Sequence, residues 1–331
     1  MSLLSQIGLK PKSRVVDDGA QTFARRLAQR LESGLFDDAE QIVASSVADN
    51  RERLVYGLAA CEGTVPLVVG WAQARPQSAW AQVALGASLI VTGWEIRGGS
   101  YAEDVDEAAW QPFLSQLAAA EEPLERAMRL DNRLAEPYAW RLHAGISQDI
   151  DRSLLTQWFQ AALARDPQHG PAHLKYFVAS TEKWGGSHAE MFAFARKSAG
   201  QAKAGSLIHA LVPAAFNEYA LATRDKGFAS LRTPANAREV SEALHVWLGA
   251  RPGQLDEKLE RVSGGFAPWC LNEFAAACYL CGADAEARLL LQALRGEIMP
   301  TPWAWISSGV RERANPAFVY DRVCKELKVV Y

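Results

Sequence analysis

Two neighbouring stretches of the chain repeat one helical pattern at a spacing of 35 residues. When Leu124–Leu142 is placed above Phe159–Phe177, apolar residues fall on apolar residues and Asp131 falls on Asp166. Both copies predict a helix that ends at an aspartate and a second helix that begins near a proline. A period near 34 residues is typical of tetratricopeptide-type repeats, in which a helix pair buries its apolar face by stacking on the next pair. The sequence therefore predicts an all-α, tetratricopeptide-like α-solenoid of stacked antiparallel helix pairs.

Prolines indicate where helices of this region end. Pro167 disfavours the helical conformation for Asp166, so the preceding helix is expected to stop there. Pro123 lies inside the apolar pattern of Phe113–Leu130. In a helix interior it would cost about 3 kcal/mol. We therefore expect a kink, or a break after which Pro123 is the first residue of a new helix.

Helical patterns continue on both sides of the repeat. Ser78–Arg97 reads as one long buried helix that ends at Gly98-Gly99, because glycine readily adopts the left-handed conformation just past a helix. Ser187 is a natural N-cap, and Glu190 three residues later completes a capping box. Further helices are expected at Leu207–Thr223, Asn236–Leu248, Trp269–Cys281, Ala283–Leu294 and Pro316–Lys328.

The domain organisation is less sharply marked. The segment Arg224–Ala235 is the best position for a longer loop or a seam between two halves. We expect an N-terminal and central helical-repeat region at 1–225. A C-terminal helical region at 226–331 would pack on the same solenoid, or the two would form one continuous domain.

Composition excludes several functional classes. Of the 331 residues 49% are apolar, enough for a substantial core, and the 35 basic and 38 acidic residues are interleaved. A nucleic-acid-binding protein usually concentrates its basic residues on one face or tail, so no nucleic-acid partner is expected. The longest apolar stretches are shorter than the roughly 20 residues that cross a bilayer, and no secretory signal precedes them. Five cysteines, an odd number, favour free thiols in a reducing cytosol. A soluble cytoplasmic protein is the expectation.

The order of motifs from about Trp94 to Ala199 resembles a family of uncharacterised bacterial tetratricopeptide-like proteins. The most specific piece begins Lys183-Trp184-Gly185-Gly186-Ser187 and continues through Glu190-Met191-Phe192 to Phe194-Ala195-Arg196, the pattern KWGGSHxEMFxFAR. The resemblance implies a helical-repeat fold and protein–protein contact, and it carries over no catalytic residue. By analogy with some bacterial helical-repeat proteins, the most concrete form of this expected protein–protein contact is an immunity or accessory role beside a secreted toxin.

No pattern of catalytic or ligand-binding residues stands out. Cys278 and Cys281 lie three apart near Cys270, but the closest histidine, His245, is 25 residues before Cys270, so buried thiols are favoured over zinc. The sequence contains no HExxH pattern, no P-loop lysine after Gly98-Gly99 and no nucleophile elbow. We therefore predict no enzyme activity, no metal and no cofactor.

Partner contact is expected from polar residues on the first helix of each pair, which lines the inner groove of such arrays. Trp184 of the motif reads either as a buried plug or as a recognition residue, and His188 as a residue exposed to solvent. The predicted partner-binding residues are Arg141, Lys175, Trp184, His188, His209 and Asn217. Several basic side chains in one groove would suit an acidic peptide or protein loop.

The leading hypothesis is a non-enzymatic scaffold that binds a protein or peptide partner in its concave groove. A second is an enzyme or small-ligand-binding protein with a pocket between the two halves near Arg224–Ala235. A third is a structural or oligomerising protein whose groove is filled by its own C-terminal helix, Pro316–Lys328.

Overall fold

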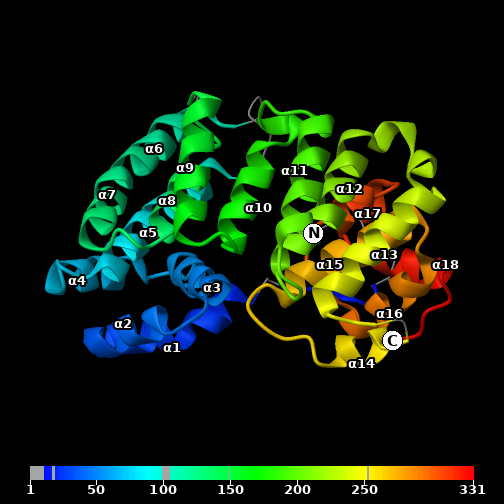
Figure 1. Cartoon of the computed structure of the whole chain (residues 1–331), viewed down its shortest axis with the longest axis horizontal. Helices are drawn as coiled ribbons and strands as arrows, with labels where there is room; N and C mark the ends of the chain where they lie inside the picture. Colours follow the sequence, from blue (N-terminus) through cyan, green and yellow to red (C-terminus); the bar gives the residue numbers. More distant parts are fainter. Residues whose placement is uncertain (1–10, 17–18, 99–104, 149, 252) are drawn as a thin grey trace. The chain divides into compact units, whose positions relative to one another are not determined.

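The computed structural model describes residues 11–16, 19–98, 105–148, 150–251 and 253–331. Regular structure in these residues is helical, apart from two strands of two residues each. This confirms the expected all-α helical-repeat fold. The chain divides into two compact units, which are shown in Figure 1: unit 2 is Gly19–Ala179, and unit 1 is Met1–Asp18 together with Ser180–Tyr331.

The boundary between these units lies at Ala179, whereas the sequence pattern placed it after residue 225. One apolar core explains the difference. Phe216, Leu231 and Val240 lie before, within and after the expected seam, and all three are buried in the same cluster of unit 1. A region that starts at residue 226 would cut through this core.

Unit 2 is formed by ten helices along its described residues. They are α1 (Ala20–Glu32), α2 (Phe36–Ala44), α3 (Ala48–Ala59), α4 (Val65–Ala74), α5 (Ala79–Arg97), α6 (Glu107–Ala119), α7 (Glu121–Leu130), α8 (Glu136–Gly145), α9 (Arg152–Arg165) and α10 (Gly170–Ala179). Helix α8 contacts α5, α7, α9 and α10, and α8, α9 and α10 lie side by side in Figure 1. Helix α8 therefore packs against helices that precede it and helices that follow it in the sequence.

The 35-residue repeat is visible in the backbone at two helix ends. Asp131 ends α7 with φ −141° and ψ 100°, and Asp166 ends α9 with φ −142° and ψ 99°. Each carboxylate accepts a hydrogen bond from the backbone N–H two residues later, at Arg133 and at Gln168. Side-chain-to-backbone bonds of this kind stabilise tight turns. The two corners are the same local structure, as the alignment of the sequence predicted.

Proline and serine positions largely match the expected helix ends. Helix α6 stops at Ala119 and α7 starts at Glu121, so the chain breaks near Pro123, although Pro123 is the third residue of α7 and not the first. The long helix α5 is confirmed, with the Ser78 hydroxyl accepting from the Ala81 N–H. It ends at Arg97, directly before Gly98, as expected. Gly98 has a φ of 75° and a ψ of −179°, which is an extended conformation open to glycine and not the left-handed helical conformation that the sequence predicted.

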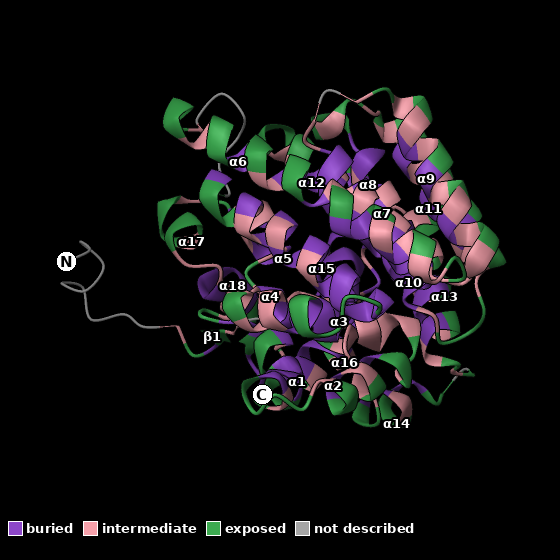
Figure 2. Cartoon of the chain, turned by 90° about the vertical axis from the view of Figure 1, so that its left-hand side faces the viewer, coloured by how far each residue is buried: buried purple, intermediate pink, exposed green. Residues whose placement is uncertain are grey.

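Unit 1 contains the remaining helices and a two-stranded sheet. The longer elements are α11 (His188–Gln201), α12 (Leu211–Ala222), α13 (Pro234–Leu248), α14 (Leu255–Glu260), α15 (Ala267–Cys281), α16 (Asp284–Leu294), α17 (Val310–Ala314) and α18 (Ala317–Glu326). The short 3-10 helices are η3 (Glu182–Trp184), η4 (Leu207–Ala210), η5 (Arg224–Lys226), η6 (Ala229–Leu231) and η7 (Trp303–Ile306). Helix α15 contacts α12, α13 and α16 and is drawn mostly as buried in Figure 2, so it is the central helix of this unit.

The beginning of the described chain is bound to the end of the same unit. Strand β1 (Arg14–Val15) pairs in parallel with β2 (Glu297–Ile298). Next to it, the Asp321 carboxylate on α18 accepts hydrogen bonds from the backbone N–H groups of residues 12 and 13 and from the Ser13 hydroxyl. These bonds are the reason that unit 1 is discontinuous in sequence.

The C-terminal helix α18 packs in the core of unit 1. Val319, Tyr320 and Val323 belong to the same buried cluster as the central helix α15. This helix is therefore part of the core of unit 1, and not a segment that fills a groove of the repeat as the third hypothesis proposed. Within the described residues, the helices are all too short or too polar to cross a membrane.

Candidate functional site

A buried group of charges in unit 2 is formed by α3, α8 and α10, and we call it the Lys175 cluster (Glu52, Glu136, Trp140, His169 and Lys175). The Lys175 ammonium donates a hydrogen bond to the Glu52 carboxylate, and its Nζ lies 3.8 Å from the centre of the Trp140 ring. Burial lowers the pKa of Lys175, and the neighbouring Glu52 opposes this effect. Lys175 is 9% exposed and Glu52 5% exposed, so this ion pair lies inside the unit.

Glu136 forms the second half of the Lys175 cluster. Its carboxylate accepts a hydrogen bond of 2.6 Å from Arg51 Nε and lies 3.7 Å from His169 Nε2. Because His169 Nδ1 accepts from the Ala172 N–H, the proton of the neutral ring is on Nε2, which faces Glu136. Burial raises the pKa of Glu136, but His169 and Arg51 outweigh it, and the net effect is a lowered pKa.

Several polar atoms around this cluster are buried without a hydrogen-bond partner. They are Glu52 Oε2, Trp140 Nε1, His169 Nε2 and, stacked on the Trp140 ring, His143 Nδ1. Burial and the Lys175 charge lower the pKa of His143 to about 3. His143 is therefore neutral near pH 7 and holds no proton that it could readily give up as an acid. Helices α8 and α10 thus hold α3 by charge pairs, and this contact covers Lys175.

A second buried group of charges lies in unit 1, where η3, α12, α15 and η7 meet, and we call it the Glu273 cluster (Lys183, Asn217, Glu218, Glu273 and Trp305). Lys183 Nζ lies 2.7 Å from the Glu218 carboxylate and 5.2 Å from the centre of the Trp305 ring. The Asn217 amide Nδ2 donates to the backbone oxygen of Glu273 at 3.0 Å and to its carboxylate at 2.6 Å. Helix α12 supplies two adjacent members of this cluster.

Glu273 has an unusual protonation state. Its side chain is fully enclosed, and burial raises its pKa to about 8. The Glu218 carboxylate contributes to this rise in pKa, whereas Asn217, Lys183 and the Trp269 indole oppose it. At neutral pH the carboxyl is therefore mostly protonated. Asn217 Oδ1 is buried next to it and has no hydrogen-bond partner.

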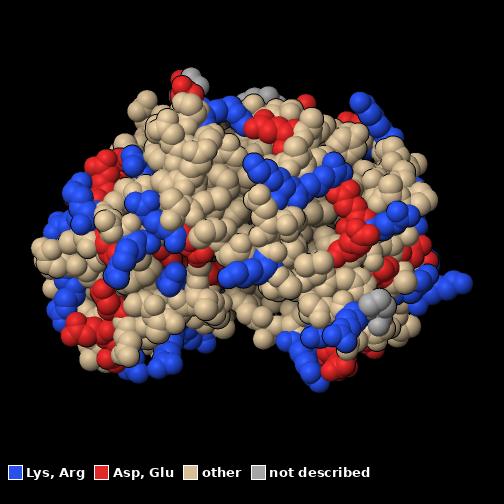
Figure 3. Space-filling view, in the orientation of Figure 1, with Lys and Arg blue, Asp and Glu red and all other residues tan. Residues whose placement is uncertain are grey.

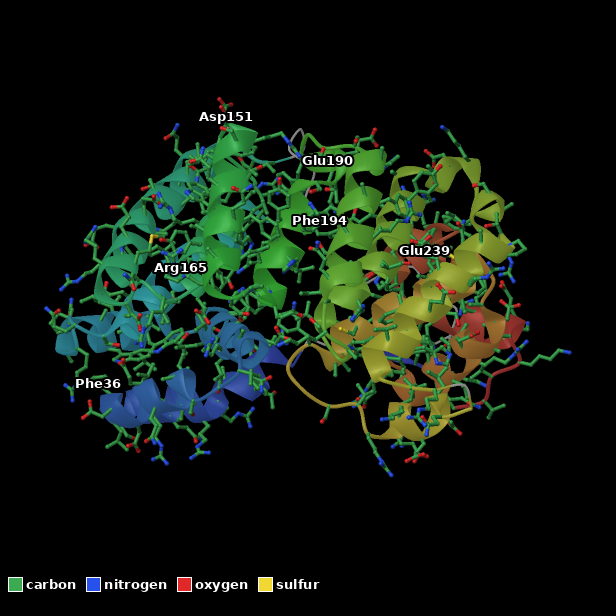
Figure 4. The ribbon with its side chains drawn as sticks, viewed as in Figure 1. Phe36, Asp151, Arg165, Glu190, Phe194 and Glu239 are labelled. Carbon is green, nitrogen blue, oxygen red and sulfur yellow. The ribbon has the colours of Figure 1, made fainter. Side chains whose placement is uncertain are left out.

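The motif found in the sequence holds Lys183 in place through its backbone. Gly185 has a φ of 80°, a left-handed conformation that glycine adopts at little cost. A Cβ on Gly186 would lie 2.1 Å from the Ser180 carbonyl oxygen, so only glycine fits there. The Ser187 hydroxyl then caps α11 by accepting a hydrogen bond of 3.2 Å from the backbone N–H of Glu190. Glu190 is labelled in Figure 4. The predicted N-cap is confirmed.

The residues expected to line one groove are distributed over both units. Arg141 pairs with Glu121, and its guanidinium lies 4.7 Å from the centre of the Trp158 ring. His209 is 4% exposed, with Nε2 3.0 Å from the Lys203 carbonyl oxygen. Lys175 and Asn217 belong to the two buried clusters described above. The structure therefore buries Lys175, His209 and Asn217 and leaves Arg141 partly exposed.

The remaining predicted residues, Trp184 and His188, come from the motif and are partly exposed. His188 Nε2 lies 3.3 Å from the Glu182 carboxylate, and its ring meets the edge of Tyr219 at 4.9 Å between centres. Trp184 follows Lys183 directly, so both residues are presented by one rigid turn beside the Glu273 cluster. Sequence reasoning singled out this motif but missed Glu218, Glu273 and Trp305, which carry no local pattern.

Four of the five cysteines are buried thiols, and Cys61 is partly exposed. Cys270, Cys278 and Cys281 are each at most 1% exposed, and burial raises the pKa of Cys281 to about 12. Such thiols are protonated at neutral pH and react slowly as nucleophiles. Among the residues that the structure describes, no three or more His, Cys, Asp or Glu side chains are grouped so as to hold a metal ion.

On the face shown in Figure 3, basic and acidic side chains are intermingled over both units.

Compared with known protein families and with curated protein sequences, the chain matches none. The resemblance to tetratricopeptide-like bacterial proteins therefore stays a prediction from the motif.

Proposed function

We propose that the protein is a non-enzymatic interaction scaffold that binds a protein or peptide partner. The repeated helix pairs of unit 2 support this, because such pairs expose extended surface and carry no reactive group. The Lys175 cluster gives further support. There α8 and α10 already hold another helix, α3, through the charge pairs of Arg51 with Glu136 and of Glu52 with Lys175.

The observation that carries the proposal is the motif turn of unit 1. Three backbone features fix it: the left-handed Gly185, the close approach at Gly186 and the cap by Ser187. Even so, it leaves the side chains of Trp184 and His188 partly exposed. A large aromatic ring held rigidly at the surface loses little conformational entropy on binding, which is why tryptophan is enriched among the residues that dominate interfaces.

This assignment moves the contact away from the groove position expected from the sequence. Lys175 is covered by α3, whereas Trp184 and His188 are accessible to a partner. In its most concrete version, by analogy with bacterial helical-repeat proteins, the protein is a cytoplasmic immunity or accessory factor and its partner a secreted toxin.

A site-specific photo-crosslinker tests the proposal. The full chain carrying p-benzoylphenylalanine at position 188 is irradiated in native lysate, and the same probe at Val246, an exposed apolar position on α13, serves as the matched control. We expect one protein to be crosslinked at 188 and not at 246. With that protein purified, Trp184→Ala should weaken binding by about 30-fold, which corresponds to about 2 kcal/mol at a central aromatic. Val246→Ala should leave it unchanged.

Two results would contradict this function. Crosslinking the same set of proteins from both positions would mean that the motif turn is ordinary surface. Unchanged affinity of a folded Trp184→Ala variant for the captured protein would show that the turn does not contribute to recognition. Circular dichroism of each variant checks that the helices are retained.

A further inference from the structure

Helices α1 and α2 of unit 2 lie side by side in Figure 1 and border a pocket of about 460 Å³. A pocket of this size is within the range of small-molecule sites, about 300–1,000 Å³. We infer that it binds a small phosphate monoester through the phosphate group. This ligand is distinct from the protein partner proposed above. Apart from Ile42, the side chains that line the pocket are polar, namely Arg26, Arg30, Asp38, Gln41, Ser45 and Ser46.

Positive charge predominates in this lining. Arg26 and Arg30 are four residues apart on α1, so their side chains lie on the same face of the helix, one turn apart. Asp38 on α2 is the acidic member of the lining, and its carboxylate lies 3.7 Å from Arg30 Nε. Two guanidinium groups and one carboxylate leave an excess of one positive charge. The pocket therefore attracts an anion.

The other acidic residues of α2 are directed to other partners. The Asp37 carboxylate lies 2.9 Å from Arg75 Nε, and the Glu40 carboxylate accepts a hydrogen bond from the Ser78 hydroxyl. Neither Asp37 nor Glu40 lines the pocket. Among the acidic side chains of α2, Asp38 is therefore the one that opposes a bound anion.

Several hydrogen-bond donors of the lining are unused. Among the residues that the structure describes, the Arg26 guanidinium has no hydrogen-bond or ion-pair partner, and the Gln41 amide and the Ser45 hydroxyl have no hydrogen-bond partner. Arg30 Nε is too far from the Asp38 carboxylate for a hydrogen bond, because N–H···O bonds span about 2.7–3.2 Å. Four side chains of one pocket therefore have donors available to a ligand.

The carbonyl groups at the end of α2 are bonded within the protein. A helix C-terminus normally disfavours an anion, because its last carbonyl oxygens have no partner in the helix. Here the Ile42 oxygen accepts from the Ser46 hydroxyl, and the Ser46 oxygen accepts from Arg51 Nη1, both at 2.8 Å. The Gln41 oxygen accepts from the backbone N–H of Ser45 at 3.0 Å. These bonds reduce the repulsion that a bound anion would meet at this helix end.

The donors of the lining suit a phosphate better than a carboxylate. A phosphate monoester carries about −1.5 to −2 charges at pH 7 and has three oxygens that are strong acceptors. A guanidinium presents a planar fork that binds two such oxygens at once, and Arg26 and Arg30 offer two forks. The Gln41 amide and the Ser45 hydroxyl supply further donors. A carboxylate, with two oxygens and a single charge, uses fewer of them. The half-buried Ile42 offers apolar surface to the organic group of the ester.

Titration calorimetry of the full chain with methyl phosphate tests the inference, at constant ionic strength and at about pH 7.5, where the ester is mostly a dianion. We expect saturable one-to-one binding. Acetate should bind about tenfold more weakly, since it offers one charge and two oxygens. Failure of methyl phosphate to reach saturation, or binding of acetate that is as tight or tighter, would overturn the inference. This comparison uses the unaltered protein, so it does not depend on whether a variant folds.

A matched pair of variants on one helix locates the site. Arg26→Gln removes a guanidinium from the lining, whereas Arg25→Gln removes the same charge from an exposed neighbour that does not line the pocket. Both side chains are exposed, so both variants should keep their fold, which circular dichroism checks. We expect Arg26→Gln to bind at least tenfold more weakly, because charge-assisted hydrogen bonds are lost. Arg25→Gln should bind within about twofold of the unaltered chain.

Two results with these variants would contradict the site. Equal weakening by both would mean that the ester is attracted by the general charge of α1 and not by the pocket. Unchanged affinity of Arg26→Gln would place the ligand elsewhere. The partner-binding function can fail or hold independently, because it is measured by crosslinking at residue 188 in unit 1.

Discussion

Lys175 Nζ lies 3.8 Å from the centre of the Trp140 ring while it donates a hydrogen bond to Glu52. The lysine on α10 is thereby enclosed between an aromatic face of α8 and a carboxylate of α3. A buried pair of this kind stabilises weakly as a pair, but each member depends strongly on the other. The three helices are coupled through this contact.

Removing one member should cost much more than removing both. Lys175→Met leaves Glu52 as a buried charge without its cation, so we expect the free energy of unfolding to fall by about 3–5 kcal/mol. The double variant Glu52→Leu with Lys175→Met should recover most of that loss. Urea unfolding of the single and double variants gives the coupling. For comparison, Arg129→Met in the exposed pair with Glu125 should change stability by less than about 0.5 kcal/mol. Strict additivity of the two single effects would mean that the pair is not coupled.

Gly186 should tolerate no side chain. A Cβ there would lie 2.1 Å from the Ser180 carbonyl oxygen, which is backbone and has little freedom to move. We expect Gly186→Ala to destabilise unit 1 by about 2 kcal/mol or more, as overpacking against a fixed backbone does. At Gly200, inside α11, an added Cβ would meet nothing within 4 Å, so Gly200→Ala should stabilise by about 0.5–1 kcal/mol. Thermal melts compare the two, and equal effects would contradict the close approach at Gly186.

Much of the fold follows from local sequence patterns. The shift that aligns Asp131 with Asp166 predicts two equivalent helix ends. At each end the aspartate carboxylate accepts a hydrogen bond from the backbone N–H two residues later, and this interaction is local in sequence. The cap at Ser187 and the end of α5 at Gly98 are local in the same sense. Strand β1 could not be foreseen, since two residues carry no periodic signal and their partner lies more than 280 residues away.

The candidate sites were only partly predictable for a related reason. Lys175 was identified as a polar residue on an inner helix, but its exposure depends on α3, whose Glu52 is 123 residues away in sequence. Asn217 was likewise identified as a polar residue on a helix. Its hydrogen-bond partner Glu273 was not, because nothing in the sequence distinguishes this glutamate from the others in helical segments. A buried carboxyl differs from a solvated one only in its surroundings, and distant parts of the chain supply these.

The stability of unit 1 should depend on pH through Glu273. Its folded pKa of about 8 lies above the ordinary value of 4.5, so the folded state holds the proton more tightly than the unfolded state does. Stability from this group is complete below about pH 4.5 and is lost as pH rises through 8. The difference in unfolding free energy between Glu273→Gln and the unaltered chain should therefore move in favour of the variant by about 4 kcal/mol from pH 5 to pH 9. Chemical denaturation at both pH values measures it, and a difference that stays constant would place the pKa near its ordinary value.

The tether at the start of the chain should stabilise unit 1. Asp321 accepts hydrogen bonds from the backbone of residues 12 and 13, from the Ser13 hydroxyl and from Tyr331. Burial raises its pKa, but these donors outweigh that effect and hold the pKa below its usual range. The stabilisation is therefore present at neutral pH and lost as pH falls below about 4.

Asp321→Ala removes all these bonds at once and leaves the donors of the buried Ser13 without this acceptor, so we expect a loss of about 2–3 kcal/mol at pH 7 and little loss at pH 3. Hydrogen exchange gives the location. The N–H groups of Arg14 and Val16, which donate to the backbone oxygens of Gly296 and Ile298, should exchange faster in the variant. Helix α5 of unit 2 provides the internal reference, because none of its bonds involves Asp321. Faster exchange in α5 to the same extent as at β1 would mean that the tether stabilises the whole chain and not the unit that contains it.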